Sequence, residues 1–422
     1  MEPRSSWFVG IDWGETKHQV CVLDAAGRER GSRAFSHTGS GLRALVKWLK
    51  KQTRVAPSLM AVGIERPDGP VVATLLAAGF GVHAINPRQI SHFRKFASHA
   101  GNKDDKRDAR WLAEALMTHR PVLRRVELPP ALIARLRERT RTADKLIRER
   151  TRQCQRIRNV LVDYFPPLLE VAGKAKNLGK PLFLEIWAKA STPEAAHKVR
   201  RSTWAKLLRR YGVTRITPDR VVALFREEAL VLAPGAREAA LESIRTALAL
   251  LQVLNAEIER AEREMTRLLD ALAQTPEVGG GPDATAPDLV SIFRSRKGAG
   301  DKALARLFAG AFEAIREGNY RRLRAACGVA PILDESGKLS HSRLRRAVPN
   351  SLQQATYILA RGVLRWDDDV KAYNQKLKAA GKKTARRQRS IADKQFRVLC
   401  AMARHRTLFD PHFATKSRSA AA

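Results

Sequence analysis

The segment WFVGIDWGETKHQVCVLD, residues 7–24, decides the fold of the N-terminal part of the chain. Residues 7–14 are apolar and β-prone, and residues 18–24 alternate between apolar and polar types. This pattern predicts two strands joined by a tight turn, and residues 31–35 predict a third strand after a second turn. Asp12 stands at the end of the first strand, so a carboxylate is expected at one edge of the sheet.

After these three strands, helical and strand patterns alternate. Apolar spacing predicts a helix at 39–50, a strand at 59–65, a helix at 69–80, a strand at 81–86 and helices at 87–98 and 107–119. Three consecutive strands followed by alternation favour a mixed sheet covered by helices, within an α/β domain. In a sheet of strand order 3-2-1-4-5, the first and fourth strands are parallel neighbours.

Four carboxylates fall where such a sheet would bring them together. Asp12 and Glu65 end the first and fourth strands, and Asp105 and Asp108 lie three residues apart at a helix start, which puts them on one helix face. Carboxylates that converge repel one another, and one or two Mg²⁺ ions are the natural counter-charge. Taken singly, these acids are better explained as a turn residue, a strand end and helix-start residues, and only together do they favour a metal site. Asp104 is the expected cap residue, because only Asp105 keeps the three-residue phase with Asp108.

The composition indicates a polyanionic partner. Lys and Arg number 78 against 42 Asp and Glu, so the formal net charge is +36, and nucleic acid is the first candidate. A membrane is not expected as a partner, because no apolar run approaches the roughly 18 residues of a spanning helix. No long apolar signal region is seen at the start, so a cytoplasmic, nucleoid-associated location is expected. The four cysteines lie far apart and are expected to be buried, apolar and reduced.

The rest of the chain is expected to be mainly helical. A heptad-like helical region is predicted over 123–274, with a helical insertion at 168–235 and the two long helices forming a hairpin. Bundle packing within one chain and a coiled coil between subunits both fit this pattern. The complete division is 1–122 for the α/β domain, 123–274 for the coiled-coil region, 275–288 for a linker, 289–413 for a C-terminal domain and 414–422 for a disordered tail.

Two groups of segments resemble one known family. GIDWGETKHQV, GIERPDGP and INPRQISHFRKFASHAGNKDDKRDARWLAEAL resemble the RuvC-like nuclease domain of the DEDD transposases of the insertion sequence 110 family, over residues 7–120. KGAGDKALARLFA (297–309) is similar to the family's Gly-x-Gly hairpin, although Lys297 stands where a proline is usual. RLRAACGVAPILDESGKLSHSRLRRAVPN (322–350) is similar to its transposase signature, which carries a serine over to Ser336.

The resemblance implies an RNase H-like fold for the first domain, a C-terminal transposase domain and DNA recombination as the activity. It implies that Ser336 is the nucleophile that becomes linked to DNA, with Asp12, Glu65, Asp105 and Asp108 binding magnesium near it. Acids and serine would come from different subunits of a homo-oligomer, a dimer that becomes a tetramer when assembled. A structured non-coding guide RNA would pair with donor and target DNA. Without the family, Ser336 is simply a turn residue before glycine.

Basic residues of the C-terminal part are expected to hold nucleic-acid phosphates, with a solvated basic face as the alternative. The candidates are Lys297, Lys302, Arg343, Arg345, Arg346, Lys382, Lys383, Arg386 and Arg387. The acidic run WDDD (366–369) is interpreted as a helix start. Three functions compete: a guided transposase, a metal-dependent nuclease acting as a Holliday-junction resolvase or a DNA invertase, and a non-catalytic nucleic-acid-binding protein.

Overall fold

The computed structural model describes residues 6–86, 104–275, 286–336, 339–345 and 347–411. The chain divides into two compact units, residues 1–129 and 130–422, which are described separately. Within the described parts of the chain, no helix is long and apolar enough to cross a membrane. The predicted helix at 87–98 and most of the predicted linker lie outside the described residues.

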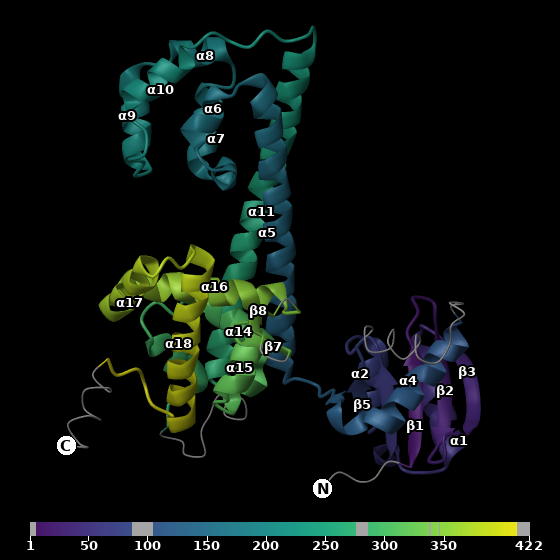
Figure 1. Cartoon of the computed structure of the whole chain (residues 1–422). Helices are drawn as coiled ribbons and strands as arrows, with labels where there is room; N and C mark the ends of the chain where they lie inside the picture. The colour runs from purple at the N-terminus through teal and green to yellow at the C-terminus, as the bar shows by residue number, and fades with distance from the viewer. Residues whose placement is uncertain (1–5, 87–103, 276–285, 337–338, 346, 412–422) are drawn as a thin grey trace, which may run out of the picture. The chain divides into compact units, whose positions relative to one another are not determined.

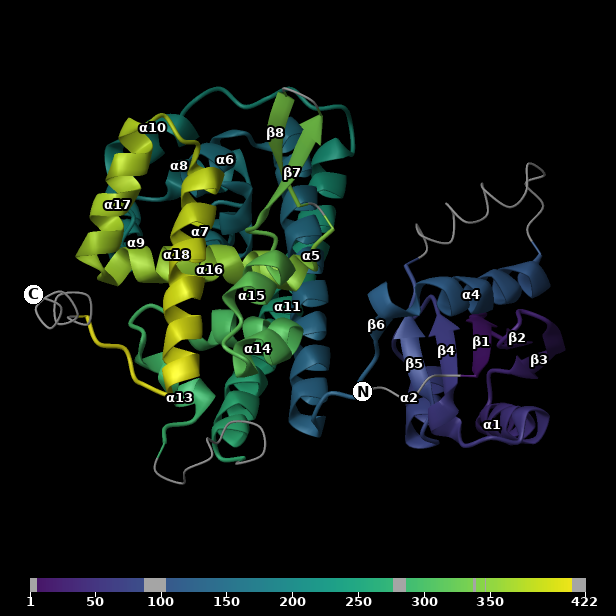
Figure 2. The ribbon, with the colours of Figure 1, turned by 60° about the horizontal axis from the view of Figure 1, so that its bottom comes forward.

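The first unit is a six-stranded sheet covered by helices on both faces (Figures 1 and 2). The strand order is β3-β2-β1-β4-β5-β6, which confirms the predicted order of the first five strands. β1 is antiparallel to β2 and parallel to β4. The elements are β1 (Trp7–Asp12), β2 (Lys17–Asp24), β3 (Glu29–Ser36), α1 (Gly39–Thr53), η1 (Pro57–Leu59), β4 (Met60–Ile64), α2 (Pro70–Ala77), β5 (Gly81–Ala84), α4 (Asp105–His119), η2 (Arg120–Val122) and β6 (Arg124–Arg125).

The alternation of buried side chains assigns the two faces of this sheet. Val9 and Ile11 of β1 belong to the cluster that includes residues of α1 and α2, whereas Phe8 belongs to the cluster that includes α4. Successive strand residues point to opposite faces, so Gly10 and Asp12 continue on the α4 face. β6 was not predicted, because two residues are too few to show a period of two; it pairs with β5 and carries the sheet past residue 122.

The second unit is built on two long helices that lie side by side, α5 (Ala131–Tyr164) and α11 (Ala236–Ala273) (Figures 1 and 2). Helices were predicted at both places. The distal halves of this pair share a core with the insertion between them. The insertion consists of α6 (Pro167–Ala172), η3 (Ala175–Gly179), α7 (Pro181–Lys189), α8 (Pro193–Lys198), α9 (Arg201–Arg210) and α10 (Pro218–Phe225).

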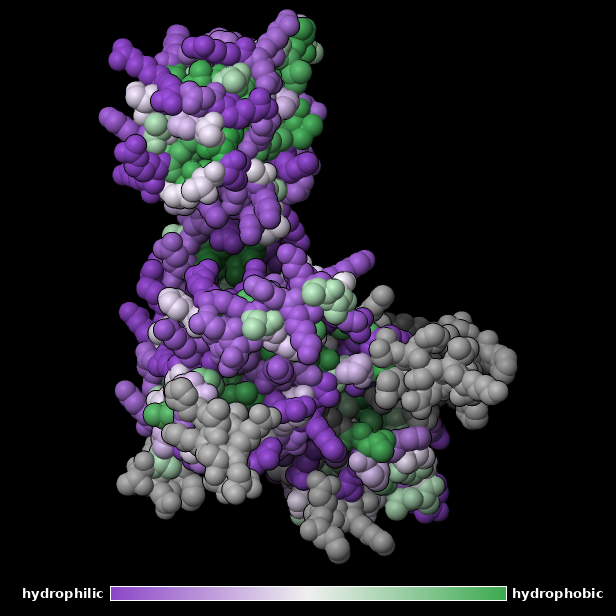
Figure 3. Space-filling model, turned by 60° about the vertical axis from the view of Figure 1, so that its left-hand side comes forward, coloured by the Kyte–Doolittle hydropathy of each residue, from purple (hydrophilic) through white to green (hydrophobic). Residues whose placement is uncertain are grey.

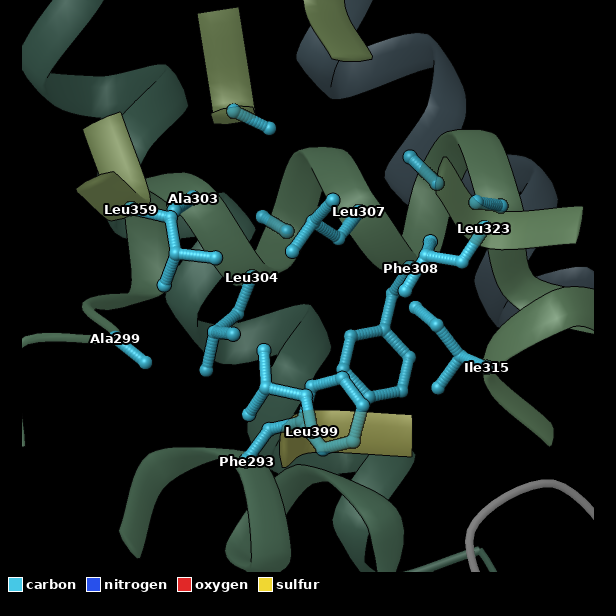
Figure 4. Packing of buried hydrophobic residues seen from close by; sticks show 14 of the residues in the cluster. Phe293, Ala299, Ala303, Leu304, Leu307, Phe308, Ile315, Leu323, Leu359 and Leu399 are labelled. Atoms are coloured by element: carbon cyan, nitrogen blue, oxygen red, sulfur yellow. The ribbon is translucent and has the colours of Figure 1, made fainter. Parts of the chain in front are cut away.

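The N-terminal half of α5 and the C-terminal half of α11 pack with the C-terminal helices in a second hydrophobic core. Phe293, Leu304, Phe308 and Leu399 pack together there from three different helices (Figure 4). The elements are α13 (Leu289–Ser295), α14 (Asp301–Arg316), α15 (Tyr320–Ala326), β7 (Pro331–Ser336), β8 (Leu339–Leu344), α16 (Asn350–Trp366), α17 (Asp368–Ala379) and α18 (Thr384–His405). The β7–β8 hairpin was not predicted within this mainly helical region.

A buried ion pair ties α5 to α14. The guanidinium of Arg306 donates to Asp144 Oδ1 at 2.8 and 3.2 Å and to the carbonyl of Lys302 at 2.8 Å. Arg306 is 1% exposed and Asp144 4%. Among the described residues, neither charge has another ion-pair partner, so the pair fixes how the long helix meets the C-terminal helices.

Candidate functional site

Asp12 and Glu65 lie level with each other at the ends of neighbouring parallel strands. Gly10 of β1 pairs with Gly63 of β4 and Ile11 pairs with Ile64, so Asp12 and the residue after Ile64 face each other across the strand ends. By alternation, both acids lie on the sheet face that α4 covers. The register therefore places the two acids at adjacent strand ends, as the sequence predicts.

The two paired glycines let α4 lie directly on the sheet. A Cβ on Gly10 would overlap the carbonyl oxygen of Ala109 and come within 2.6 Å of the Ala113 nitrogen. A Cβ on Gly63 would come within 3.1 Å of the carbonyl oxygen of Leu112. A side chain at either position would hold the helix off the strands, so the glycines set the height at which α4 approaches Asp12.

The start of α4 carries three aspartates with different surroundings. Asp104 is the N-cap, as predicted, and its side chain accepts a hydrogen bond from the Lys106 backbone N–H at 3.1 Å. Asp105 is exposed, whereas Asp108, one turn further on, is 2% exposed. Acidic residues in a first helical turn are favoured by the helix dipole.

One cavity of about 750 Å³ collects all of these groups. Five carboxylates line it against two lysines, Lys17 and Lys106, which leaves an excess of negative charge in a chain that is otherwise strongly basic. The lining residues are Asp12, Trp13, Gly14, Lys17, Gln19, Glu65, Asp104, Asp105, Lys106 and Asp108. Sequence reasoning did not single out Gln19, although it pairs directly with Asp12 in the antiparallel register and strand alternation could have found it.

The donor set suits a hard cation, although it is not gathered tightly. Asp12, Glu65, Asp105 and Asp108 offer only carboxylate oxygens, which are the ligands that Mg²⁺ prefers. Within the described residues, however, no group of three or more His, Cys, Asp or Glu side chains is arranged closely enough to hold a metal. The side chains border one cavity, and cation binding would have to draw them together.

A pair of histidines supports the turn that follows Asp12. The backbone N–H of Gly14 donates to His18 Nδ1 at 3.3 Å, so the neutral His18 carries its proton on Nε2, which lies 2.8 Å from His37 Nδ1. Burial, together with the nearby His37, lowers the pKa of His18 to about 4. Trp13 contacts both rings and lies under the guanidinium of Arg66 at 4.5 Å. The wall of the cavity at the β1–β2 turn is thus held by a His18 side chain that is uncharged near neutral pH.

Ser336 belongs to the second unit. It is the last residue of β7, and its backbone pairs with Leu339 at the tip of the β7–β8 hairpin. The side chain of Ser336 lies outside what the structure describes. Ser336 therefore lies at the tip of a hairpin and not in an isolated turn between helices.

Several of the predicted phosphate-binding residues have partners within the chain. Lys297 Nζ lies 4.9 Å from the ring centre of Trp366, and Lys302 pairs with Glu262 at 2.6 Å. Arg387 donates to Asn374 Oδ1 and to the carbonyl of Lys382. These contacts leave those three side chains less available to a ligand than the sequence alone indicates, and their role stays a prediction.

The other predicted basic residues lie near the β7–β8 hairpin and the start of α18. Arg343 and Arg386 are exposed and line one cavity, whereas Lys383 is the residue before α18. Nε of Arg345 is buried and has no hydrogen-bond partner among the described residues. Arg346 lies outside the described residues.

Two other sequence predictions are confirmed here. WDDD starts a helix, because Asp367 caps α17 through the Val370 N–H at 2.9 Å and pairs with Arg296 at 2.5 Å. Burial opposes ionisation, yet these two partners hold the pKa of Asp367 below its ordinary value. All four cysteines are free and buried, and burial raises the pKa of Cys21, Cys327 and Cys400 to about 12.

Comparison with known proteins adds two family matches. Residues 9–166 match a family model described as a transposase of the DEDD type of IS110, and residues 290–375 match one described as transposase IS116/IS110/IS902 family. The first match includes the acid cavity, and the second includes the β7–β8 hairpin.

Individual relatives extend the match over nearly the whole chain. A Sinorhizobium fredii protein named "Putative transposase y4uE" is 40% identical over 216 residues, which cover 51% of this chain and 59% of that protein. The Streptomyces coelicolor "Mini-circle putative transposase for IS117" is 28% identical over 92% of this chain and 91% of its own length. The IS110 43.6 kDa protein of Streptomyces coelicolor is 24% identical over 96% and 95%.

Proposed function

Because the chain belongs to the IS110 family of DEDD transposases, we propose that it cleaves and exchanges DNA strands in the transposition of an insertion sequence. The observation that carries this proposal is the acid cavity, in which Asp12, Glu65 and the start of α4 meet at one edge of the sheet. A net charge of +36 around an acidic cavity suits an enzyme that holds nucleic acid broadly and cations locally.

Asp12, Glu65, Asp105 and Asp108 would hold one or two Mg²⁺ ions. When bound, such ions supply activation of an attacking oxygen and stabilisation of the leaving oxygen in phosphodiester chemistry. The residues of the chain provide the frame: the strand register keeps Asp12 and Glu65 level, and the glycine contact holds α4, with Asp108, against them. His18 keeps the turn after Asp12 in place through its hydrogen bonds with Gly14 and His37.

Ser336 is the proposed nucleophile. Its oxygen would form a phosphoester bond with DNA, while the bond to the leaving strand breaks and the departing oxygen takes up a proton. A serine hydroxyl is weak by itself and needs a metal or base beside it, and the acids belong to the other unit of the chain. The similarity of this segment to the family signature supports the assignment.

Donor and target DNA are the proposed substrates, and a structured non-coding RNA is the proposed guide. The chain is proposed to work as a homo-oligomer, with the acids and the serine of one reaction site coming from different subunits. The long helix pair α5–α11 is proposed to contribute to this assembly as a coiled coil.

The test is magnesium-dependent cleavage of DNA carrying the ends of the element, assayed together with nucleic-acid binding. Asp105→Asn should abolish cleavage and leave binding nearly intact, whereas Glu114→Gln, on the same helix and paired with Arg110 at the surface, should keep both. Cleavage that survives Asp105→Asn contradicts the metal role of α4.

A denaturing gel separates the serine mechanism from a metal-only nuclease. The natural chain should form a covalent protein–DNA species that Ser336→Ala loses and Ser340→Ala, on the neighbouring strand, retains. Cleavage without a covalent species would assign the protein to the resolvase type instead. Binding without any cleavage would leave it a non-catalytic nucleic-acid-binding protein.

A further inference from the structure

A cavity of about 340 Å³ lies where the β7–β8 hairpin meets α15 and α18. Four arginines line it against one aspartate, and we call it the arginine cavity. Its lining residues are Arg324, Val329, Pro331, Arg343, Leu344, Arg386, Arg389, Ser390 and Asp393. Two basic segments that are far apart in the sequence, Arg343 with its neighbours and the start of α18, therefore contribute to one site.

The side chains from α18 are in phase. Arg386, Arg389, Ser390 and Asp393 are spaced by three, four and seven residues, so they share one helix face. Arg343 approaches from β8, where it pairs with Ile332 of β7. The site is thus built from three elements that the C-terminal fold brings together.

The aspartate is already occupied. Both oxygens of Asp393 accept from Arg324, at 2.8 and 3.0 Å, and Oδ1 also accepts the Tyr320 hydroxyl at 2.8 Å. Arg386 and Arg389 form no ion pair with any residue that the structure describes. Positive charges gathered in one cavity repel one another unless an anion joins them.

The geometry suits a phosphodiester group. The planar guanidinium fork matches phosphate oxygens in pairs of parallel hydrogen bonds, which is why arginine is preferred for this ligand. Polar residues that can donate, such as Ser390, lie beside the forks, and Arg324 is held rigidly by Asp393. Because the guanidinium of Arg324 is already fixed, it loses little conformational entropy when it binds an anion.

The hairpin relates this cavity to Ser336. Ile332, opposite Arg343, is four residues before Ser336 on β7, which is roughly 13 Å along an extended strand. A DNA strand carries a phosphate about every 3.4 Å along a duplex axis, and the direct distance between successive phosphates is larger because the strand winds around that axis. One strand could therefore lie over both places, with the two phosphates within about four nucleotides of each other.

We propose that the arginine cavity binds a backbone phosphate of the DNA strand within about four nucleotides of the phosphate that reacts with Ser336. This inference rests on the proposed function for the role of Ser336. The cavity positions the strand and reads no sequence, because phosphate contacts carry no base information.

The first experiment measures binding to duplex DNA in EDTA, where no cleavage can occur. Arg386→Gln with Arg389→Gln should weaken affinity about tenfold or more at 0.1 M salt and make the salt slope shallower by about 0.9 for the phosphate lost. The matched control is Arg209→Gln with Arg245→Gln, which removes equal charge from exposed sites on α9 and α11. Glutamine is a good helix former, and circular dichroism checks that both double variants fold.

The second experiment locates the phosphate. Single methylphosphonates, which are neutral, are placed along the DNA strand that becomes linked to Ser336. One position within about four nucleotides of the linkage should weaken binding by the natural chain but not further weaken the cavity double variant. A cavity variant that binds as tightly as the control pair, or that loses affinity only for an RNA of the same sequence, overturns the inference.

The two proposals fail separately. If the natural chain cleaves DNA and the cavity variant binds normally, the arginine cavity is not a DNA site while the proposed function stands. If the cavity variant loses DNA binding but the natural chain forms no covalent species, the cavity binds DNA in a protein that is not this recombinase, and the assignment of its phosphate relative to Ser336 is wrong.

Discussion

Adding one methyl group at Gly10 should disturb both the stability and the chemistry of the first unit. In Gly10→Ala, the new Cβ lies 2.6 Å from the Ala113 nitrogen and overlaps the carbonyl oxygen of Ala109. Ordinary contact begins near 3.4 Å, so α4 must retreat by about 0.8 Å or more. The clash is with helix backbone, which cannot move aside as the end of a side chain can.

The expected cost follows from overpacking of a close-packed interface, about 1–3 kcal/mol of unfolding free energy. Asp108 lies one residue before Ala109, so it retreats with the helix from Asp12. A displacement of about 1 Å in a reacting geometry costs about 100-fold in rate. The Mg²⁺-dependent cleavage rate should therefore fall by about that factor even where the variant is fully folded.

Two other glycines provide a graded control. Gly63→Ala meets the flexible end of Ile85 at 2.7 Å and helix backbone only at 3.1 Å, so its effect should be smaller. Gly39→Ala, at the start of α1, has nothing closer than the end of Arg43 at 3.6 Å and should be neutral. Hydrogen exchange of the β1 and α4 amides measures the order of effects. If Gly10→Ala protects these amides and cleaves DNA as well as Gly39→Ala does, the close approach does not set the site geometry.

Two further predictions concern buried charge. Asp144→Ala should destabilise the second unit by about 3–5 kcal/mol, because it leaves Arg306 buried without its partner, whereas Asp163→Ala, exposed on the same helix, should change stability by less than about 0.5 kcal/mol in urea unfolding. An equal effect of the two would show that the ion pair is dispensable. The pKa of His18 is lowered from 6.5 to about 4 in the folded protein. The contribution of neutral His18 to the free energy of unfolding is therefore complete above pH 6.5 and declines as the pH falls from 6.5 to about 4. Below pH 4 it declines no further, and the total loss is at most about 3 kcal/mol. His18→Asn offers the Gly14 N–H an acceptor that does not titrate. The stability of β1 and β2, measured by hydrogen exchange of their amides, should then depend less on pH between 7 and 4 than in the natural chain. An unchanged pH dependence would rule out His18 as its source.

The strand order and the strand-end acids could be predicted because they depend on local pattern. Alternation and turn residues mark each strand, and three strands followed by alternation leave few sheet orders. The role of Gly10 and Gly63 was available in principle, since a glycine inside a buried strand indicates close approach of another backbone. It needed the register, in which the two glycines are partners, to become visible.

Charge pairing across the helices could not be predicted in the same way. The sequence places acidic residues on α11 and arginines on α5, but of three glutamates only Glu264 pairs across to Arg135, whereas Glu257 and Glu259 pair with arginines of their own helix. Glu262 pairs with Lys302 from a third element. Exposed pairs of this kind contribute little free energy, so nothing in the sequence selects one partner over another. The arginine cavity escaped prediction because its members come from three separate segments of the chain, α15, the β7–β8 hairpin and α18, which meet only in the folded C-terminal part.

On the proposed function, the arginine cavity contributes to DNA binding and the acid cavity contributes to cleavage. The acid cavity repels a phosphate until cations neutralise its five carboxylates, so it cannot contribute to DNA affinity in EDTA. The arginine cavity attracts a phosphate without any metal, because its one carboxylate is already paired. Binding should therefore be independent of magnesium and sensitive to salt, whereas cleavage should depend on magnesium. Asp105→Asn is therefore expected to bind DNA without cleaving it, whereas the double variant of Arg386 and Arg389 is expected to bind DNA more weakly both with and without magnesium.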